Sequence, residues 1–297
     1  MSRFEILMPY YGDVRLMQDA VRSVLAQDGD DWRLTVVDDG KEPDVPGWFE
    51  SLADPRVRYF RNENNLGVSG NFNRCVELAE HEYLVLMGCD DLMHPNYLRV
   101  IREALRRFPD VGMVQPGVLV IDADGQPTTS LADTVKRRLY APRNPAPVRM
   151  SGEPLAMSLM RGDWLYFPSI CWRTKDIQNA SFRSDLGVIQ DLAIIVDLLL
   201  AEVSLAVMPE VCFSYRRHAV SESSVTAFTG KRFEEARRFF RETGDRLDAH
   251  GWHRAAAISR RYVSSRLHAI SLIPAAGRKA GMRGVGAMLS HVAGRRA

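Results

Sequence analysis

The sequence predicts an α/β protein in which helices flank a mainly parallel sheet and a helical extension follows at the C-terminal end. Short apolar runs with the composition of buried strands alternate with segments whose apolar residues recur at helical spacing. Two of these runs end in adjacent aspartates, and beyond about Thr229 the pattern is helical and no longer alternates. Such alternation is typical of parallel strands joined by right-handed helical crossovers.

Strand and helix signals alternate in the first part of the chain. Residues 4–8 form an apolar strand that ends at Pro9, and residues 14–26 carry apolar side chains at helical spacing. A second strand, 33–37, stops at the pair Asp38-Asp39. The later elements expected from the same signals are strands over 56–60, 83–87 and 112–119 and helices over 68–80 and 95–108.

The pattern is less regular after the turn signal that begins at Asp122. A Pro-rich, basic stretch there predicts a surface loop or a mobile flap, and order returns with a short helix. Residues 192–201 then predict an apolar helix, entered through Gln190 and Asp191, and residues 206–215 predict a strand. That strand ends in the basic cluster Arg216, Arg217 and His218.

Composition is that of an ordinary globular protein. Of the 297 residues, 46% are hydrophobic and 26% are charged, and no repeat or low-complexity tract is present. The four cysteines show no CxxC spacing, which argues against a zinc site or a disulfide framework. The first residues lack the apolar segment of a signal peptide and no apolar run predicts a membrane span, so we expect a cytoplasmic protein. The P-loop motif and the GxGxxG fingerprint are both absent.

The formal charge of +2 hides an asymmetry between the two ends of the chain. Residues 249–297 contain nine Arg or Lys residues and neither Asp nor Glu, which leaves a charge of about −7 on the rest. A basic segment of this kind suits nucleic acid, an anionic membrane surface or an acidic partner. Charge alone leaves these alternatives open.

Adjacent aspartates end two predicted strands, Asp38-Asp39 after the second and Asp90-Asp91 after the fourth. In open α/β sheets ligands bind beyond the carboxyl ends of the strands, so parallel neighbours would bring both pairs to one crevice. Carboxylate oxygens, with phosphate oxygens and water, suit Mg2+ or Mn2+, which makes Asp90-Asp91 a candidate site for a metal–diphosphate complex. The alternative is that Asp91 caps the following helix or that the pair belongs to a solvated turn.

Four stretches carry a recognisable pattern: VVDDG, NNLGVSGNFNRCVELAEHEYLVLMGCDD, QDLAIIVDLLL and VCFSYRRH. Together they resemble the family 2 glycosyltransferases, which have the GT-A fold. The resemblance covers most of residues 4–220, in order. It implies a GT-A catalytic domain over 1–228, with a nucleotide-binding half of about 1–120 and an acceptor half of about 121–228, and it leaves 229–297 as a basic helical extension.

The resemblance implies a set of residues that bind the nucleotide of the donor. Pro9, Tyr10 and Tyr11 occupy the turn whose aromatic ring flanks the base in the family, and Asp39 would accept a hydrogen bond from the base. Asn73 matches the asparagine of the helix that follows the NxG turn. Helix capping or packing is the alternative role of Asn73.

The resemblance also implies a divalent cation, Mn2+ or Mg2+, at the second acidic pair. Asp91 would hold the metal and Asp90 the metal or the donor ribose, while Gly88 stands where the family's signature has its first Asp. Arg216 and His218 match the family's basic segment and would bind the diphosphate, with His218 as a further metal ligand. Alternation along a strand leaves at least one of the two adjacent arginines on the surface.

Asp191 stands where the family has its catalytic base, with Gln190 in place of the preceding Glu. Inverting transfer needs one carboxylate that accepts the proton of the acceptor hydroxyl while this oxygen attacks the anomeric carbon. The alternative role of Asp191 is an N-cap for the helix that follows.

Aromatic side chains lie where the family shapes its acceptor pocket. Aromatic faces stack well on sugar rings, although a cluster this apolar also suits a core. These residues are Trp164, Tyr166, Phe167 and Trp172.

Taken together, the resemblance predicts an inverting, metal-dependent glycosyltransferase. It would move a sugar from a nucleotide-diphosphate sugar, with UDP- or dTDP-sugars favoured, to a hydroxyl of a sugar, lipid-linked or small-molecule acceptor in bacterial glycan or secondary-metabolite glycoside assembly. No nucleic-acid partner is expected. The alternatives are a non-catalytic relative that keeps the fold as a binding or scaffold module, and a nucleotidyltransferase, which would need a Gly- and Arg-rich phosphate loop after the first strand.

The C-terminal segment combines apolar residues with the basic excess. This amphipathic character predicts either a helix that lies on an anionic membrane or a helix packed on the catalytic domain. Gly281, Gly284 and Gly286 weaken any long helix there.

Overall fold

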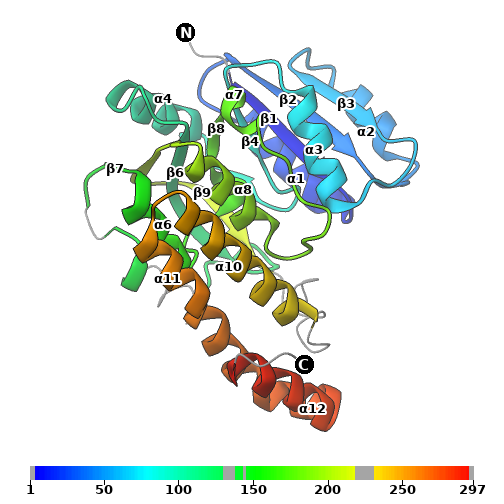
Figure 1. The fold of residues 1–297 in the computed structure, drawn as a ribbon. Helices are drawn as coiled ribbons and strands as arrows, with labels where there is room; N and C mark the ends of the chain where they lie inside the picture. The colour runs from blue at the N-terminus through cyan, green and yellow to red at the C-terminus, as the bar shows by residue number, and fades with distance from the viewer. Residues whose placement is uncertain (1–3, 130–137, 143–144, 218–230, 294–297) are drawn as a thin grey trace.

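The computed structural model describes residues 4–129, 138–142, 145–217 and 231–293. A central sheet is flanked by helices, and the C-terminal helices extend away from it (Figure 1). The strands are β1 (Phe4–Tyr10), β2 (Trp32–Asp38), β3 (Val57–Arg61), β4 (Tyr83–Leu86), β5 (Leu92–Met93), β6 (Met113–Ile121), β7 (Val148–Met150), β8 (Cys171–Arg173) and β9 (Leu205–Arg216). The helices are α1 (Val14–Leu25), α2 (Val45–Leu52), α3 (Gly67–Leu78), α4 (Tyr97–Arg107), α6 (Gly152–Arg161), the 3₁₀ turn η1 (Phe167–Ser169), α7 (Thr174–Ile177), α8 (Gln190–Leu200), α10 (Lys231–Ala249), α11 (His253–Arg261) and α12 (Val263–Ala293).

The sheet has the order β3-β2-β1-β4-β8-β6-β9-β5, with β7 paired to β9. Strands β3, β2, β1 and β4 are parallel to one another, as are β6 and β9. Strand β8 runs antiparallel to both β4 and β6 and joins the two parallel groups. All six expected strands and all four long helices are confirmed to within a few residues. The short strands β5, β7 and β8 were not expected, because two or three residues carry no periodic signal.

The core lies on both faces of the parallel strands. Along β1, Leu7 belongs to one buried cluster while its neighbours Ile6 and Met8 belong to the other, and all three are fully buried. Strands buried on both faces read as continuous apolar runs, which is why these strands were visible in the sequence.

The first two C-terminal helices share the main core. Phe239 and Leu247 of α10 and Ala255 of α11 are buried in the same cluster as Leu7 and Leu84. The core therefore continues across the boundary expected near residue 229. Only α12 has a separate small cluster, and its helical path is interrupted at Gly281. Among the described residues no helix combines the length and the apolar character that crossing a bilayer requires.

Gly117 allows β6 and β9 to approach closely at a register shift. A Cβ atom there would lie 2.6 Å from the backbone oxygens of both Pro209 and Glu210. We expect Gly117→Ala to lower the free energy of unfolding by about 1–3 kcal/mol, as overpacking does, in urea titrations followed by circular dichroism. Gly47→Ala in α2 is the matched control, because a Cβ there meets nothing within 4 Å and alanine favours a helix. Equal stability of the two variants would contradict the prediction.

Candidate functional site

The carboxyl ends of β2, β1 and β4 bring the two acidic pairs to one edge of the sheet. Tyr10 at the end of β1 lies opposite Asp38 at the end of β2. On the other side of β1, the β4 register is continued by Met87, whose N–H donates to the carbonyl of Leu7 at 2.9 Å. Both strands are thus parallel neighbours of β1, which confirms the arrangement expected from the sequence.

Asp38 is a structural carboxylate. It is fully buried and accepts hydrogen bonds from the hydroxyl of Tyr59 and from Arg61 Nε and Nη2, at 2.8 and 2.7 Å for the arginine. The amide of Gly40 donates to its other oxygen at 2.7 Å. Burial, and then the neighbouring Asp38 charge, raise the pKa of Tyr59. Asp38 therefore fixes β3 against β2.

Asp39 organises the start of α3. Its carboxylate accepts from Asn62 Nδ2 at 2.8 Å and from the backbone amides of Leu66 at 2.8 Å and Gly67 at 2.9 Å. These amides are at the N-terminus of the helix, where four N–H groups have no partner within the helix. A nucleotide base would have to share this carboxylate with the helix or displace one of its donors.

The other predicted donor-binding residues differ in exposure. Tyr10 is fully buried and its hydroxyl donates to the carbonyl of Gly12 at 3.0 Å, whereas Tyr11 is 68% exposed. Only Tyr11 therefore presents its ring to a ligand at the end of β1. Asn73 exchanges two hydrogen bonds with the backbone of Phe182, at 3.0 and 2.8 Å, which is the packing role left open by the sequence. Pro9 lies within β1.

Asp91 is buried with one oxygen unmatched. Its Oδ1 accepts from the amide of Arg216 at 2.8 Å, while its buried Oδ2 has no hydrogen-bond partner within the described part of the chain. Burial, and then the charge of Asp90, raise the pKa of Asp91 well above its ordinary value. A Cβ at Gly88 would lie 2.5 Å from Asp91 Oδ2 and 3.1 Å from Asp90 Oδ1. The absence of a side chain at Gly88 thus leaves room for both carboxylates.

Arg216 contacts the acidic pair from β9 through the backbone. Its guanidinium donates to the carbonyls of Asp90 at 2.7 Å, Asp122 at 3.1 Å and Ala123 at 3.0 Å, and the residue is 7% exposed. Its side chain therefore holds two turns together rather than facing a ligand. Arg217 is the exposed member of the pair, as strand alternation requires, and His218 lies outside the described residues.

Tyr215 lies within electrostatic reach of both the acidic pair and the candidate base. Burial is the main cause that raises the pKa of its phenol, and the charges of Asp91, Asp90 and Asp191 each raise it further. These three carboxylates come from a strand end and from the start of α8, more than ninety residues apart. The ring of Tyr166 lies 5.4 Å from that of Tyr215 and extends the site with a second aromatic face.

Asp191 sits in the first turn of α8. The amide of Leu192 donates to its Oδ1 at 2.8 Å. Its neighbour Gln190 is 8% exposed and accepts from the hydroxyl of Ser69 at 2.6 Å, which ties the start of α8 to α3. Gln190 is therefore a structural link between the two halves of the domain.

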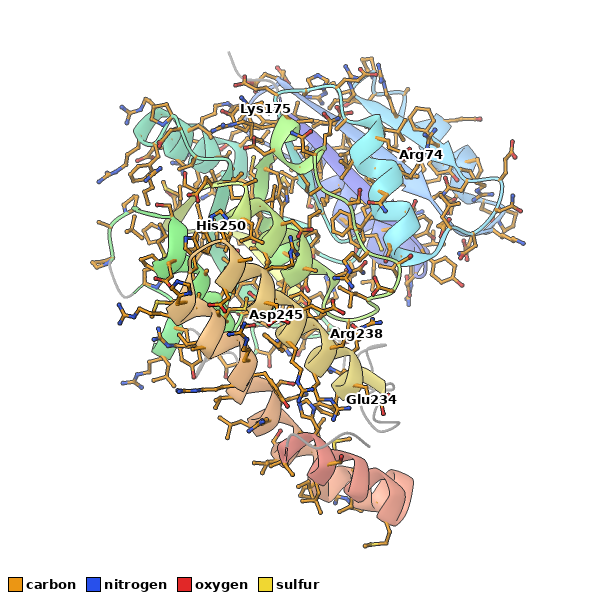
Figure 2. The ribbon with its side chains drawn as sticks, in the orientation of Figure 1. Arg74, Lys175, Glu234, Arg238, Asp245 and His250 are labelled. Carbon is orange, nitrogen blue, oxygen red and sulfur yellow. The ribbon has the colours of Figure 1, made fainter. Side chains whose placement is uncertain are left out.

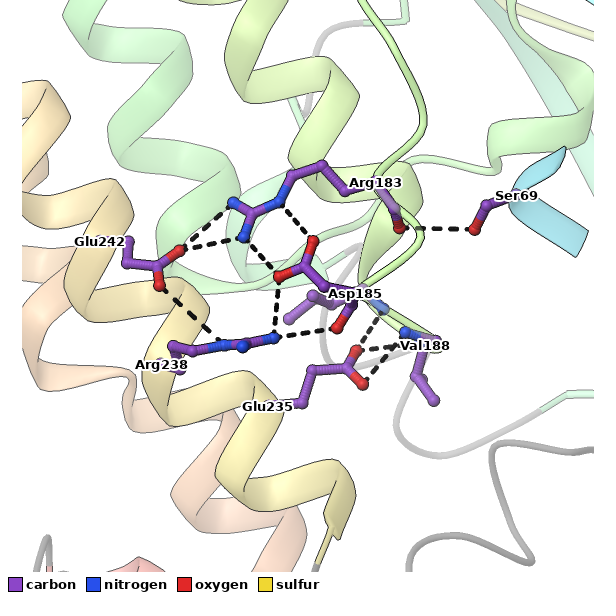
Figure 3. A network of polar contacts seen from close by, with 9 residues as sticks. Ser69, Arg183, Asp185, Val188, Glu235, Arg238 and Glu242 are labelled. Atoms are coloured by element: carbon purple, nitrogen blue, oxygen red, sulfur yellow. Dashed lines mark hydrogen bonds and ion pairs between the residues drawn. The ribbon is translucent and has the colours of Figure 1, made fainter. Parts of the chain in front are cut away.

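The loop before Asp191 is held by α10 (Figure 3). The carboxylate of Glu235 accepts from three successive amides, those of Gly187 at 3.1 Å, Val188 at 3.0 Å and Ile189 at 3.2 Å. A network of ion pairs continues this contact. It joins Arg183 to Asp185 at 2.8 Å, Arg183 to Glu242 at 3.2 Å, and Arg238 to Asp185 at 3.0 Å.

Most aromatic residues expected at an acceptor pocket lie in the core. Trp172 is fully buried, Trp164 is 5% exposed and donates from Nε1 to Ser158 Oγ, and Phe167 packs against Trp172. Tyr166 is half-buried beside Tyr215. The core alternative therefore holds for the other three, because apolar rings next to a sheet are most stable when fully buried.

The described residues contain no group of three or more His, Cys, Asp or Glu side chains arranged to hold a metal ion. The acidic pair supplies two carboxylates, of which Asp91 presents a buried oxygen without a partner. This donor set fits a cation that completes its shell with phosphate oxygens and water.

Residues 5–144 match the profile of the family described as Glycosyl transferase family 2. Over these residues the chain belongs to this family. The family match covers β2, β3, β4, β6, all but the first residue of β1, and both acidic pairs, and it ends before α6.

Relatives and solved structures agree with this assignment. An uncharacterized protein of Mycobacterium tuberculosis is 26% identical over 76% of this chain and 70% of its own length. A putative colanic acid biosynthesis glycosyl transferase, WcaA of Escherichia coli, is 34% identical, but over only 32% of this chain and 35% of its own. The crystal structure of S. aureus TarS 1-349 in complex with UDP-GlcNAc superposes with a TM-score of 0.68 at 14% identity, over 98% of this chain and 81% of the TarS 1-349 chain. This last likeness shows the GT-A fold.

Glu235 is the residue at this site that the sequence did not reveal. It lies in the segment expected to be an extension, and only its position one helical turn before Phe239 and Phe240 distinguishes it from other glutamates in the sequence. Its contacts make it a positioning residue for the loop that precedes Asp191.

Removing this carboxylate leaves three amides without an acceptor. We expect Glu235→Ala to speed hydrogen exchange at residues 187–189 and to lower the free energy of unfolding by about 1.5–3 kcal/mol, the usual contribution of hydrogen bonds to a charged group. Glu234→Ala is the matched control, because Glu234 is exposed at the same end of α10 (Figure 2). Unchanged exchange of residues 187–189 in Glu235→Ala would show that α10 does not hold the loop.

Proposed function

We propose that the protein is an inverting, metal-dependent hexosyltransferase. It moves a sugar from a nucleotide-diphosphate sugar, with UDP- or dTDP-sugars favoured, to an acceptor hydroxyl in bacterial glycan or secondary-metabolite glycoside assembly. The observation that carries the proposal is the convergence of Asp90, Asp91 and Asp191 on Tyr215 in a family 2 chain. The name of WcaA, a putative glycosyl transferase, supports the class of reaction. The UDP-GlcNAc in the TarS complex supports the class of donor.

The donor lies, in this proposal, across the carboxyl ends of β1, β2 and β4. Tyr11 stacks on the base, and Asp39 meets the base from the turn that it shares with α3. A Mn2+ or Mg2+ ion held by Asp91 and Asp90 would neutralise the departing diphosphate. The unmatched, buried Oδ2 of Asp91 supports this role, because a bound cation would compensate its charge. His218 and Arg217 complete the anion-binding side.

The chemical step needs one base. The acceptor oxygen forms a bond to the anomeric carbon as the bond from that carbon to the diphosphate breaks on the opposite face, and Asp191 takes the hydroxyl proton. Its location in the first turn of α8 supports this role, because the helix N-terminus favours the negative carboxylate there. The tie from Gln190 to Ser69 and the contacts of Glu235 hold this turn in place.

The acceptor side is built from Tyr166 and Tyr215. An aromatic pair beside a carboxylate suits a sugar ring, and we propose a sugar, lipid-linked or small-molecule acceptor. The proposed location is the cytoplasm, with peripheral contact at the inner face of the membrane where a lipid-linked acceptor would be met.

The rival proposal is a non-catalytic protein with the GT-A fold. Gly88 in place of an acidic residue and Gln190 in place of Glu favour it. A non-catalytic protein that keeps the donor site would bind the nucleotide as the enzyme does. Only the enzyme requires Asp191. Two experiments separate them.

The first experiment is a thermal-shift titration with UDP, dTDP and GDP, each with and without Mn2+. At about 100 times its dissociation constant a nucleotide adds about 2.7 kcal/mol of stability, which moves a melting temperature by several degrees. We expect one nucleotide to stabilise the protein only with metal, and Asp91→Asn to abolish that shift because it removes the anionic metal ligand. The exposed Asp19→Asn is the control. The donor proposal fails if no nucleotide shifts the melt.

The second experiment follows release of the nucleoside diphosphate from the donor that stabilises the protein. We expect Asp191→Asn to lower this rate by about 10²–10⁴-fold, the usual contribution of a general base, while the nucleotide still shifts the melt. Asp19→Asn again serves as the control. An unchanged rate in Asp191→Asn would exclude Asp191 as the base, and a wild-type protein that binds nucleotide but releases none with any acceptor would favour the binding module.

A further inference from the structure

Helix α12 is a hairpin that leaves the body of the protein (Figure 1). Gly281 has the non-helical angles φ 60° and ψ −154°, so the helix breaks there. Beyond the break the chain returns to its start, because His291 Nε2 lies 3.0 Å from the hydroxyl of Ser265 and its ring lies 5.3 Å from that of Tyr262. Gly281, one of the three glycines expected to weaken a long helix, thus lies at the turn between two antiparallel arms.

One side of this hairpin is packed and the other is not. Phe233 of α10 packs with the buried residues of the arms, Ala269, Ala276 and Met288. On the first arm three large apolar residues point outward at the spacing i, i+4, i+7. They are Val263, Leu267 and Ile270, and they are 51%, 57% and 46% exposed. This apolar stripe has no partner among the described residues.

The turn of the hairpin carries a second apolar group within a basic sequence. Met282 follows Gly281 and is 83% exposed, the highest value of any large apolar residue described. Arg278, Lys279 and Arg283 are its near neighbours in sequence. The whole segment 249–297 has nine basic residues and no acidic one.

We propose that the hairpin, residues 263–293, docks on an anionic lipid bilayer. The apolar stripe and Met282 enter the interfacial region, and the basic side chains meet lipid phosphates, as interfacial amphipathic helices do. An interfacial contact is consistent with the absence of a described helix able to cross the bilayer.

Charge and chemistry favour a bilayer over the other occupants of such a surface. A second copy would bring two strongly basic segments together, and like charges oppose that contact. A nucleic acid would match the charge but would leave the exposed Leu, Ile and Met side chains in water. A bilayer is the partner that satisfies both features. If the proposed function holds, this contact would bring the active site to lipid-linked acceptors.

The test is sedimentation of the full chain with vesicles of phosphatidylcholine alone and of phosphatidylcholine mixed with phosphatidylglycerol. We expect binding only to the anionic vesicles, weakened by salt, and about tenfold weaker in Ile270→Asp and in Met282→Asp. Val211→Asp is the matched control, because Val211 is also 46% exposed and the substitution changes the net charge equally, but at β9.

Several results would overturn the proposal. These are no binding to anionic vesicles, equal loss in Val211→Asp, or a wild-type dimer in light scattering that Ile270→Asp converts to a monomer, which would assign the stripe to a second copy. Melting curves of each variant confirm that it is folded. Nucleotide-induced shifts in the same variants separate this test from the transferase proposal, because loss of vesicle binding with an intact nucleotide shift concerns only the hairpin.

Discussion

Burial of carboxylates at the carboxyl edge of the parallel strands is the constraint on which the site depends. Burying a carboxylate costs free energy unless hydrogen-bond donors surround it. Each of these carboxylates therefore accepts hydrogen bonds from another segment of the chain. Asp38 binds Arg61 of β3, and Asp39 binds backbone amides at the start of α3. Asp91 accepts a hydrogen bond from the amide of Arg216 at the end of β9. Three segments from separate parts of the chain are thereby fixed around one edge.

These carboxylates differ in how completely they are satisfied. Asp39 accepts from three donors and Asp38 from an ion pair, but Asp91 has one amide for two buried oxygens. Proteins keep such an imbalance mainly at functional sites, where a ligand supplies the missing interaction. Gly88 offers no side chain to the unmatched oxygen of Asp91, and an acidic side chain at position 88 would crowd Asp91 Oδ2. A cation at this site would therefore rely on phosphate and solvent oxygens for most of its ligands.

Periodicity predicted the parts of the fold that are regular over several residues. Strands β1, β2 and β4 are buried on both faces and are flanked by polar turns, so both their existence and their polar ends were visible. The direction of a side chain was harder to predict from the sequence. Tyr10 and Tyr11 are both tyrosines, and only the folded backbone determines that Tyr10 is buried and Tyr11 exposed. Trp172 was ambiguous for a related reason, because β8 is too short to show which face it occupies. The role of Arg216 depends on carbonyls ninety residues away, which no local pattern records.

The C-terminal third divides into two parts with different physical roles. Helix α10 has apolar residues in the main core and a carboxylate on the loop before Asp191, so it is packed as part of the same body as the sheet. The family match ends at residue 144, before either α8 or α10. The loop before Asp191, which lies outside the family match, is thus held by contacts from α10, which lies outside it as well. Helix α12 has few residues in any core and leaves its apolar stripe, Val263, Leu267 and Ile270, exposed.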